Sequence, residues 1–282
     1  MKNQGYTTLN MGGHLLALDT PVVMGILNAT PDSFYASSRV REEREMAQRA
    51  LDMAAEGASI LEVGGCSTRP GSAPADEEEE MARLRRCLPV VCRACPDVPL
   101  SVDTFRPDVA RMCVEEFGVA MVNDVSGGND EMFRMVARLK VPYVLMSTAP
   151  DVETMLRTWV RQVDQLHDLG VADIVLDPGF GFGKTLEDNY RVLSQLDRLH
   201  ALPQPLLVGV SRKSMACRLL DITPDEALNA TTVIHTVALE KGAAILRVHD
   251  VRPAIEAIRV VSALTSKPQS NIKPQTSNLK VN

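Results

Sequence analysis

Short runs of aliphatic residues recur along the chain, and each run ends in a polar or functional side chain before a helix-like stretch begins. A parallel strand that is covered on both faces has this continuous apolar pattern, whereas a half-exposed strand alternates. Eight such runs with intervening helices predict an α/β fold, a single (β/α)8 TIM barrel. The runs lie at residues 22–26, 59–63, 100–102, 121–122, 143–145, 174–176, 206–210 and 245–246.

The ends of these runs predict where a functional site lies. The active site of a (β/α)8 barrel is built at the carboxyl ends of its strands. Polar side chains that follow the apolar runs should therefore meet at one rim, although they are far apart in the sequence. The residues so placed are Asn28, Asp103, Asn123, Asp177, Lys213 and Arg247.

The segments between the runs are expected to form helices. Gly57, Gly118, Gly170 and Gly242 each stand just past an expected helix, where a left-handed cap is favoured. The expected helices cover residues 41–56, 76–95, 107–117, 130–139, 152–169, 186–199, an interrupted pair within 213–241, and 252–264.

The two ends of the chain differ from the repeating part. Residues 6–18, with Gly12-Gly13 between two apolar stretches, predict a β-hairpin before the first barrel strand, where it would plug the bottom of the barrel. Residues 266–282 are polar, contain prolines and have little to bury, which predicts a disordered tail. We therefore expect one barrel domain over residues 1–265, followed by a tail over residues 266–282.

Composition and charge narrow the class of partner. The 282 residues are 45% apolar and carry a net charge of -6, which argues against nucleic acid as a partner. The first residues lack the apolar core of a signal peptide, and no apolar run is long enough to span a membrane. We expect a cytoplasmic protein whose partners are small molecules rather than nucleic acid or membrane.

Three cysteines, Cys87, Cys92 and Cys95, have a spacing similar to one ferredoxin cluster pattern. They fall in an expected helix, however, so they would face different sides of it instead of surrounding a cluster. The better interpretation is that they are small buried hydrophobic residues.

A glycine-rich segment at residues 177–185 supports two interpretations. Gly183-Lys184-Thr185 suggests a phosphate loop, but Pro178 stands where that motif needs glycine, and proline has no N–H to offer a phosphate. Alternatively, the glycines let the backbone turn tightly beside a flat ligand, with Phe182 against a ring and Asp177 at the strand end. A simple glycine-rich turn remains open for the glycines, but it explains Asp177 poorly.

Four further loops carry candidate chemistry, and each has a structural alternative. The loops at 28–34 and 64–71 contain residue types that favour turns, and we expect both loops to be able to close over a site. At residues 208–214 we expect a helix that begins at Ser211, whose N–H groups and two cations would form an anion site. Instead of serving a ligand, Asp103 could cap the helix that begins near Pro107. Arg247 and His249, two positions apart on a strand, could simply point toward one solvated face. Neither a nucleophile elbow nor a zinc-protease motif is present in the sequence.

Seven motifs resemble those of the dihydropteroate synthase family of pterin-binding barrels, over residues 21–262. They lie at 24–34, 67–71, 101–104, 123–124, 176–184, 211–214 and 247–250. The resemblance implies a transferase of folate biosynthesis and sulfonamide target. Such an enzyme condenses dihydropterin-methyl diphosphate with para-aminobenzoate, giving dihydropteroate and diphosphate. The resemblance also implies Mg²⁺ as cofactor and a homodimer.

The resemblance further implies roles for individual residues. It makes Asp103, Lys213 and Arg247 the catalytic residues and places Asn28 on the metal. Diphosphate would be held by Asn28, Arg247 and His249. Hydrogen bonds to the pterin edges would come from Asp103, Asn123, Asp177 and Lys213, with Arg247 on the ring face. The aminobenzoate site would be bordered by Thr68, Arg69, Pro70, Phe182 and Ser211, and further substrate contacts would come from Met146 and Gly209.

The sequence departs from the family pattern at several of these motifs. The first loop continues as Tyr35-Ala36-Ser37-Ser38 where the family often has Ser-Asp-Gly-Gly. Glu62 stands where aspartate is usual, Cys66 where glutamate is common, and Ser147-Thr148 where a His-Met pair is common. These changes bear on loop motion and drug response more than on the pterin pocket.

Two other functions use the same fold. A pterin-barrel methyltransferase module would share the carboxylates, but it has no need of Ser-Thr-Arg-Pro-Gly or Ser-Arg-Lys-Ser, and both are present. A non-catalytic pterin-binding protein is supported only by the altered first loop. Release of diphosphate that depends on both substrates distinguishes the enzyme from that alternative.

Overall fold

Eight parallel strands close into a barrel, as the apolar runs predicted, and their order is β10-β3-β4-β5-β6-β7-β8-β9. The structure, a computed structural model, describes residues 8–28, 36–66 and 75–265. The predicted tail at 266–282 therefore lies outside the described residues. The barrel strands are β3 (Val22–Asn28), β4 (Ile60–Gly64), β5 (Leu100–Asp103), β6 (Met121–Asp124), β7 (Tyr143–Met146), β8 (Ile174–Asp177), β9 (Leu206–Val208) and β10 (Ala243–Val248).

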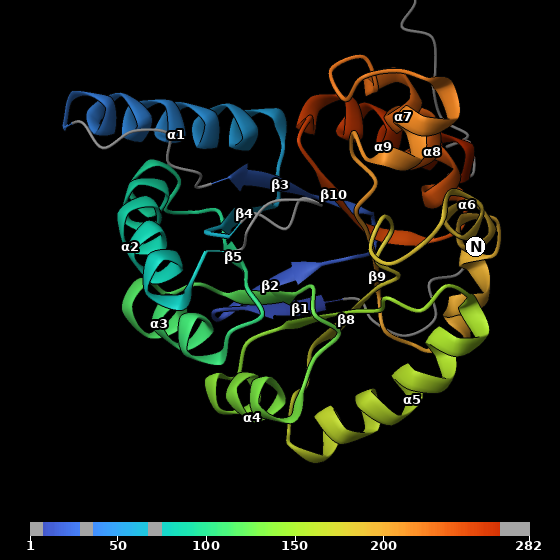
Figure 1. The fold of residues 1–282 in the computed structure, drawn as a ribbon, viewed down its shortest axis with the longest axis horizontal. Helices are drawn as coiled ribbons and strands as arrows, with labels where there is room; N and C mark the ends of the chain where they lie inside the picture. Colours follow the sequence, from blue (N-terminus) through green and yellow to red (C-terminus); the bar gives the residue numbers. More distant parts are fainter. Residues whose placement is uncertain (1–7, 29–35, 67–74, 266–282) are drawn as a thin grey trace, which may run out of the picture.

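Helices follow the strands and surround the barrel (Figure 1). Three of the expected helices differ from the observed ones by more than one residue at an end. The first helix begins at Ala36, five positions earlier than expected. The helix expected over 186–199 ends at Ser194 and is followed by a 3-10 helix, η1 (Leu196–Ala201). The helix expected to begin at Ser211 begins at Ser214. The helices are α1 (Ala36–Glu56), α2 (Glu77–Ala94), α3 (Pro107–Phe117), α4 (Asp130–Leu139), α5 (Val152–Asp168), α6 (Leu186–Ser194), α7 (Ser214–Leu220), α8 (Leu228–Glu240) and α9 (Val251–Thr265).

Local signals explain most of the helix boundaries. Asp76, Asn129 and Asp151 accept backbone N–H groups at the starts of α2, α4 and α5, and Thr185 forms a capping box with Asp188 at α6. These contacts satisfy N–H groups that have no partner within the helix. The four glycines expected at left-handed positions all have positive φ, between +68° and +106°.

Strand side chains alternate between the barrel interior and the helices, and both faces are apolar. Val23, Leu61, Val63, Val102 and Leu145 pack outward into the core shared with the helices. The inward-facing residues form a separate apolar layer across the barrel: Met24, Ile60, Met121, Val144, Val175, Leu207 and Ile245. Burial on both faces is the reason that the strands have continuous apolar sequences.

The predicted hairpin forms and closes the amino-terminal end of the barrel. Strands β1 (Thr8–Met11) and β2 (His14–Ala17) pair in antiparallel fashion. Leu9 and Met11 pack against the inward apolar layer, and the N–H of Asn10 donates to Asp173 Oδ2 just before β8 (3.0 Å). With this end covered, the carboxyl end of the barrel is the one available to a ligand.

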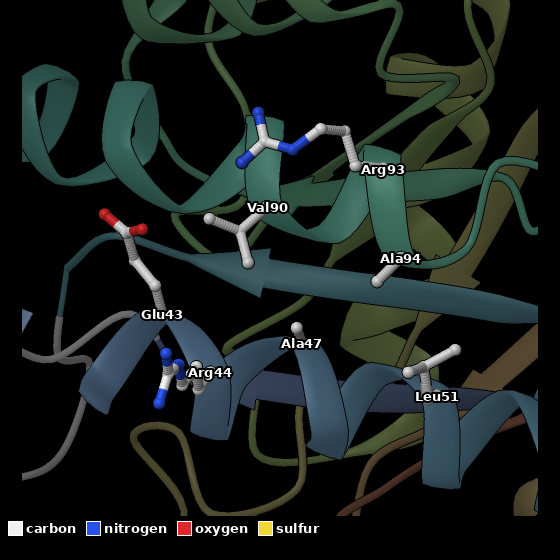
Figure 2. Close-up of a pocket in the computed structure, with 7 residues that line it drawn as sticks. All are labelled: Glu43, Arg44, Ala47, Leu51, Val90, Arg93 and Ala94. Atoms are coloured by element: carbon white, nitrogen blue, oxygen red, sulfur yellow. The ribbon is translucent and has the colours of Figure 1, made fainter. Parts of the chain in front are cut away.

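A hollow of about 420 Å³ lies on the outside of the barrel, between α1 and α2 (Figure 2). Ala47, Leu51, Val90 and Ala94 form its apolar part. None of its lining residues is a predicted site residue, so the hollow is separate from the polar rim of the barrel. No helix among the described residues is long and apolar enough to cross a membrane.

Candidate functional site

A polar layer lies directly above the inward apolar layer, because inward positions recur every second residue along a strand. Two residues beyond the apolar layer, four of these strands carry a charged or amide side chain. On these four strands the inward apolar residue and the polar residue after it are Ile60 and Glu62, Met121 and Asn123, Val175 and Asp177, and Ile245 and Arg247. On two other strands Val144 is followed by Met146, and Leu207 by Gly209. The predicted rim residues Asn123, Asp177 and Arg247 are thus brought to the carboxyl end of one barrel.

Arg247 is the centre of this layer. Its Nη2 donates to Asp103 Oδ2 (2.7 Å), and its Nε and Nη2 also contact Glu62 Oε2. Asn123 Nδ2 donates to Glu62 Oε1 (2.8 Å). One guanidinium therefore joins residues from β4, β5 and β10, and through Glu62 it is linked to β6. These contacts use Nε and Nη2, so neither carboxylate engages Nη1.

Two carboxylates share this one guanidinium, which leaves an excess negative charge. Burial raises the pKa of Asp103 to about 7, since the attraction of Arg247 only partly offsets desolvation and Glu62 adds repulsion. Burial alone would lower the pKa of Arg247, but Glu62 and Asp103 outweigh that effect and raise it. The pKa of Asp103 is thus shifted toward the neutral acid, whereas that of Arg247 is shifted further toward the cation.

Asn123 offers an acceptor that nothing in the described protein uses. The residue is fully buried, and its Oδ1 has no hydrogen-bond partner among the described residues. A buried acceptor without a partner costs about 1–3 kcal/mol. Such a group at the mouth of a barrel fits a ligand that brings an N–H donor.

Asp177 and Lys213 form the second charged pair of the mouth. The N–H of Gly179 donates to Asp177 Oδ1 (2.7 Å), and Lys213 Nζ donates to the carbonyl of Phe180 (2.7 Å). Burial raises the pKa of Asp177 and lowers that of Lys213 to about 8, while each group attracts the other. Lys213 Nζ also lies 4.7 Å from the centre of the Phe182 ring. This side of the mouth therefore combines a carboxylate, a cation and an aromatic face.

Lys184 shows that the glycine-rich segment is not a phosphate loop. Its Nζ donates to the carbonyls of Ser147 (2.9 Å) and Gly179 (3.0 Å), and burial lowers its pKa to about 8. The ammonium is bound by backbone oxygens instead of facing a phosphate. At Gly179 φ is +65°, and an added Cβ would lie 2.3 Å from the carbonyl of Ser147. The turn therefore needs glycine for close approach, as the flat-ligand interpretation expected.

The anion site expected at Ser211 is wrong in its geometry. No helix begins there: α7 starts at Ser214, and Arg212 has a left-handed φ of 53°. Arg212 donates to both carboxylate oxygens of Asp250 (2.7 and 3.0 Å), so its charge is neutralised. The Ser211 hydroxyl instead accepts from the N–H of His249 (3.2 Å) and lies 3.1 Å from His249 Nδ1. Ser211 thus orients His249.

The other predicted site residues lie on or just past strands around the same mouth, or in a loop that the structure does not describe. Asn28 ends β3 and is exposed, with Gly64 and then Asp103 beside it on the next two strands. Met146 is paired with Asp177 in the β7–β8 register, and a Cβ on Gly209 would contact Arg247 and Lys213. Thr68, Arg69 and Pro70 lie outside the described residues.

The structure decides between the alternatives for Asp103, Arg247 and the cysteines. The residue before α3 is Arg106, which makes no side-chain cap, so Asp103 does not cap that helix. The side chain of Arg247 is 13% exposed and bound to two carboxylates, so it does not lie on a solvated face. All three cysteines pack against the core, as expected, but only Cys95 is buried, whereas Cys87 and Cys92 in α2 are half-buried.

Glu62 is the residue that the sequence-based site missed. Its side chain is fully buried and contacts both Asn123 and Arg247. A signal was present, since a carboxylate inside an otherwise aliphatic run needs a buried partner. Its partner, however, lies 185 positions away in the sequence.

Comparison with known proteins places this site among pterin enzymes. A family model described as "Pterin binding enzyme" matches residues 24–249. The chain is 38% identical over 276 residues to the dihydropteroate synthase of Escherichia coli K12, with 92% of this chain and 96% of that protein covered.

Solved structures with bound ligands are also similar. Xanthomonas albilineans dihydropteroate synthase with 4-aminobenzoic acid has a TM-score of 0.84 and 38% identity, covering 93% of this chain and 99% of that one. The Xanthomonas albilineans enzyme in complex with 7,8-dihydropteroate has a TM-score of 0.81 and 34% identity, covering 93% of this chain and all of that one.

Proposed function

Because the chain belongs to the dihydropteroate synthase family of pterin-binding enzymes, we propose that its barrel mouth condenses dihydropterin-methyl diphosphate with para-aminobenzoate in folate biosynthesis. The products are dihydropteroate and diphosphate. The observation that carries the proposal is the joint placement of Asp103, Asn123 and Asp177, two carboxylates and an unpartnered amide oxygen, around one buried mouth. A flat heterocycle with several N–H donors matches these acceptors.

The binding step follows from the hydrogen-bonding capacity of each residue. The pterin ring has two adjacent donors, the ring N3–H and the 2-amino group, which one carboxylate can accept together. Asp177 supplies that carboxylate, with Lys213 beside it as a donor to ring acceptors. Phe182 lies next to Lys213 and offers an apolar face.

The chemical step separates charge, and the mouth holds groups of both signs. The bond between the pterin methylene carbon and diphosphate breaks, and the electron pair leaves with diphosphate. The amine lone pair then forms the C–N bond, and a proton leaves that nitrogen. Asp103 stabilises the positive charge that develops on the pterin methylene, and Arg247 and His249 stabilise the departing anion. The aryl amine is neutral near pH 7 and needs no base to activate it.

The aminobenzoate end is assigned to the motif residues around the mouth. We place Thr68, Arg69 and Pro70, with Phe182 and Ser211, along that subsite. The carboxylate of para-aminobenzoate needs a cation. Arg69 fills that role in the proposal, because Arg212 is neutralised by Asp250.

A direct assay tests the proposed reaction. Purified protein is incubated with the pterin diphosphate, para-aminobenzoate and Mg²⁺, and both diphosphate and dihydropteroate are measured. We expect equimolar release of the two products, with none when either substrate is left out. Tight pterin binding without diphosphate release would contradict the proposal and support a non-catalytic binding protein.

Mg²⁺ is proposed as the cofactor, with Asn28 as its protein ligand. The described residues contain no group of three or more His, Cys, Asp or Glu side chains able to hold a metal ion. Mg²⁺ bound with phosphate substrates often takes only one or two protein oxygens, and the exposed carboxamide of Asn28 at the strand end fits that pattern. When bound, Mg²⁺ would supply charge stabilisation for the leaving diphosphate.

We expect Asn28→Ala to weaken Mg²⁺ binding about 10-fold when diphosphate is present, because one oxygen ligand is lost. Calorimetric titration of Mg²⁺ into the protein with diphosphate measures the change without turnover. Asn28→Asp keeps an oxygen ligand and should bind at least as tightly as the parent chain. Equal Mg²⁺ affinity in Asn28→Ala and the parent would remove Asn28 from the metal.

We also propose a homodimer formed through the outer helices α8 and α9, which pack against each other. Val233 on α8 and Val260 and Leu264 on α9 are 57%, 63% and 71% exposed, so these two packed helices present several apolar side chains on their outer surface. A second copy of this chain would cover them. We place the protein in the cytoplasm, in keeping with its six free cysteines.

Val260→Glu is expected to convert the dimer to a monomer, because a carboxylate would be buried in an apolar interface. Light scattering during gel filtration should give twice the chain mass of 30.8 kDa for the parent and the single mass for the variant. Val160→Glu, at an exposed apolar residue of α5, is the matched control and should stay dimeric. A monomeric parent would refute the dimer.

A further inference from the structure

Glu62 is a fully buried carboxylate that the proposed reaction does not use. Its side chain enters the polar layer from β4 and has no solvent exposure. A buried charge of this kind is costly unless each oxygen has a partner. Both oxygens do: Oε1 accepts from Asn123 Nδ2 (2.8 Å), and Oε2 accepts from Arg247 Nε. Glu62 therefore joins a proposed pterin ligand to a proposed diphosphate ligand.

The chemistry of a carboxylate decides which way Asn123 faces. An ionised carboxylate can only accept hydrogen bonds, whereas a carboxamide has a donor end and an acceptor end. The NH₂ end of Asn123 must therefore face Glu62, since the reverse orientation would bring two acceptors together. Oδ1 is then turned away from Glu62 and has no partner among the described residues.

We propose that Glu62 is a positioning residue that fixes Asn123 as a hydrogen-bond acceptor and so makes the pocket selective for a pterin edge that carries an N–H donor. This inference rests on the proposed function. It adds a specificity determinant that never touches the substrate.

The donor in question can be narrowed by the chemistry of the ring. Asp177 takes the adjacent N3–H and amino donors in the proposed binding mode. Asp177 leaves two donors: the second hydrogen of the 2-amino group, which both oxidation states of the ring carry, and N8–H, which only the 7,8-dihydropterin carries. In this inference N8–H is the donor that Asn123 Oδ1 accepts. In the oxidised pterin, N8 carries no hydrogen and is itself an acceptor. An Asn123 oxygen held in place by Glu62 therefore discriminates between the two oxidation states of the same ring.

The energetic consequence is a difference in affinity between two nearly isosteric ligands. The dihydropterin satisfies Asn123 Oδ1, whereas the oxidised pterin places one acceptor against another. An unsatisfied buried acceptor of this kind lowers affinity about 10-fold or more. Glutamine at position 62 would no longer fix the orientation of Asn123. Its NH₂ group can donate to Asn123 Oδ1, and the Asn123 amide would then turn its NH₂ group toward the ligand.

The test uses 6-hydroxymethyl-7,8-dihydropterin and 6-hydroxymethylpterin, which lack the diphosphate and do not react. Calorimetry should show that the parent chain binds the dihydropterin about 10-fold more tightly than the oxidised pterin. Glu62→Gln should reduce that ratio to less than about threefold. Glu62→Asp, which keeps two acceptor oxygens, should retain the preference.

Two further variants separate selectivity from folding. Glu80→Gln alters another fully buried glutamate, one that lies in α2, pairs with Arg106 just before α3 and does not touch Asn123. Glu80→Gln should lower the free energy of unfolding about as much as Glu62→Gln does, but it should leave the ratio of the two pterin affinities unchanged. Asn123→Ala keeps the Glu62–Arg247 pair and should lose the preference, so it stands in if Glu62→Gln fails to fold.

The outcomes distinguish the role of Glu62 from the function itself. A parent that binds neither pterin would overturn the proposed function. A parent that binds the dihydropterin but shows no preference, or an unchanged ratio in Glu62→Gln, would overturn only the role of Glu62. A ratio that falls in Glu62→Gln and Asn123→Ala but not in Glu80→Gln supports it.

Discussion

Replacing Arg247 with alanine is expected to lower kcat/KM about 10³-fold, because the guanidinium has two roles at the mouth. In the proposed reaction it stabilises the departing diphosphate, and in the structure it contacts Asp103 and Glu62 and holds them in place. Its loss leaves two buried carboxylates without a counter-charge, which should destabilise the fold by about 3–5 kcal/mol. The measurements are steady-state kinetics on folded protein and a thermal unfolding curve.

A control is needed because stability and activity fall together in this variant. Arg106→Ala removes the partner of buried Glu80 and should cost comparable stability, with a much smaller loss of kcat/KM. If Arg247→Ala lowered the unfolding temperature but left kcat/KM of the folded fraction unchanged, Arg247 would be structural only.

Replacing Asp177 with asparagine is expected to weaken dihydropterin binding about 100-fold, equivalent to about 3 kcal/mol. Asp177 Oδ1 already accepts from the N–H of Gly179 (2.7 Å), so in the proposed binding mode the two pterin donors use Oδ2 and the remaining lone pair of Oδ1. An amide has only one acceptor oxygen, so its NH₂ group would face either the N–H of Gly179 or the ligand donors. In both orientations one donor would face another donor. Calorimetry with 6-hydroxymethyl-7,8-dihydropterin measures the loss directly.

The matched control for this substitution lies at the other end of the same strand. Asp173 stands just before β8 at the amino-terminal end of the barrel, where its side chain accepts the N–H of Asn10 (3.0 Å). Asp173→Asn makes the same chemical change and should leave pterin affinity within about twofold. Unchanged affinity in Asp177→Asn as well would count against the assignment.

The barrel and the positions of its rim residues could be predicted from the sequence because two simple rules hold. Strands buried on both faces have continuous apolar sequences, and parallel strands place their carboxyl ends at one rim. Asp103, Asp177 and Arg247 each follow such a run, so their convergence needed no knowledge of distant contacts. The hairpin was predictable for a similar reason, since Gly12-Gly13 marks the turn.

The parts that could not be predicted depend on contacts between distant residues. Ser211 was expected to start a helix, but Arg212 adopts a left-handed φ that is uncommon outside glycine and is anchored to Asp250, 38 positions later. The partner of Glu62 is likewise remote in the sequence. Local pattern identifies which side chains reach the mouth, whereas the pairing among them decides which ones remain available to a ligand.

In the proposed binding mode, Asp103, Asn123 and Asp177 surround a single flat ligand at the carboxyl end of the barrel. A crystal structure of the chain with 6-hydroxymethyl-7,8-dihydropterin tests it most directly. We predict the ring in the mouth, with Asp177 on its N3–H and amino edge and Asn123 Oδ1 accepting from N8–H. A ring bound elsewhere, for instance in the hollow between α1 and α2 (Figure 2), would contradict this binding mode.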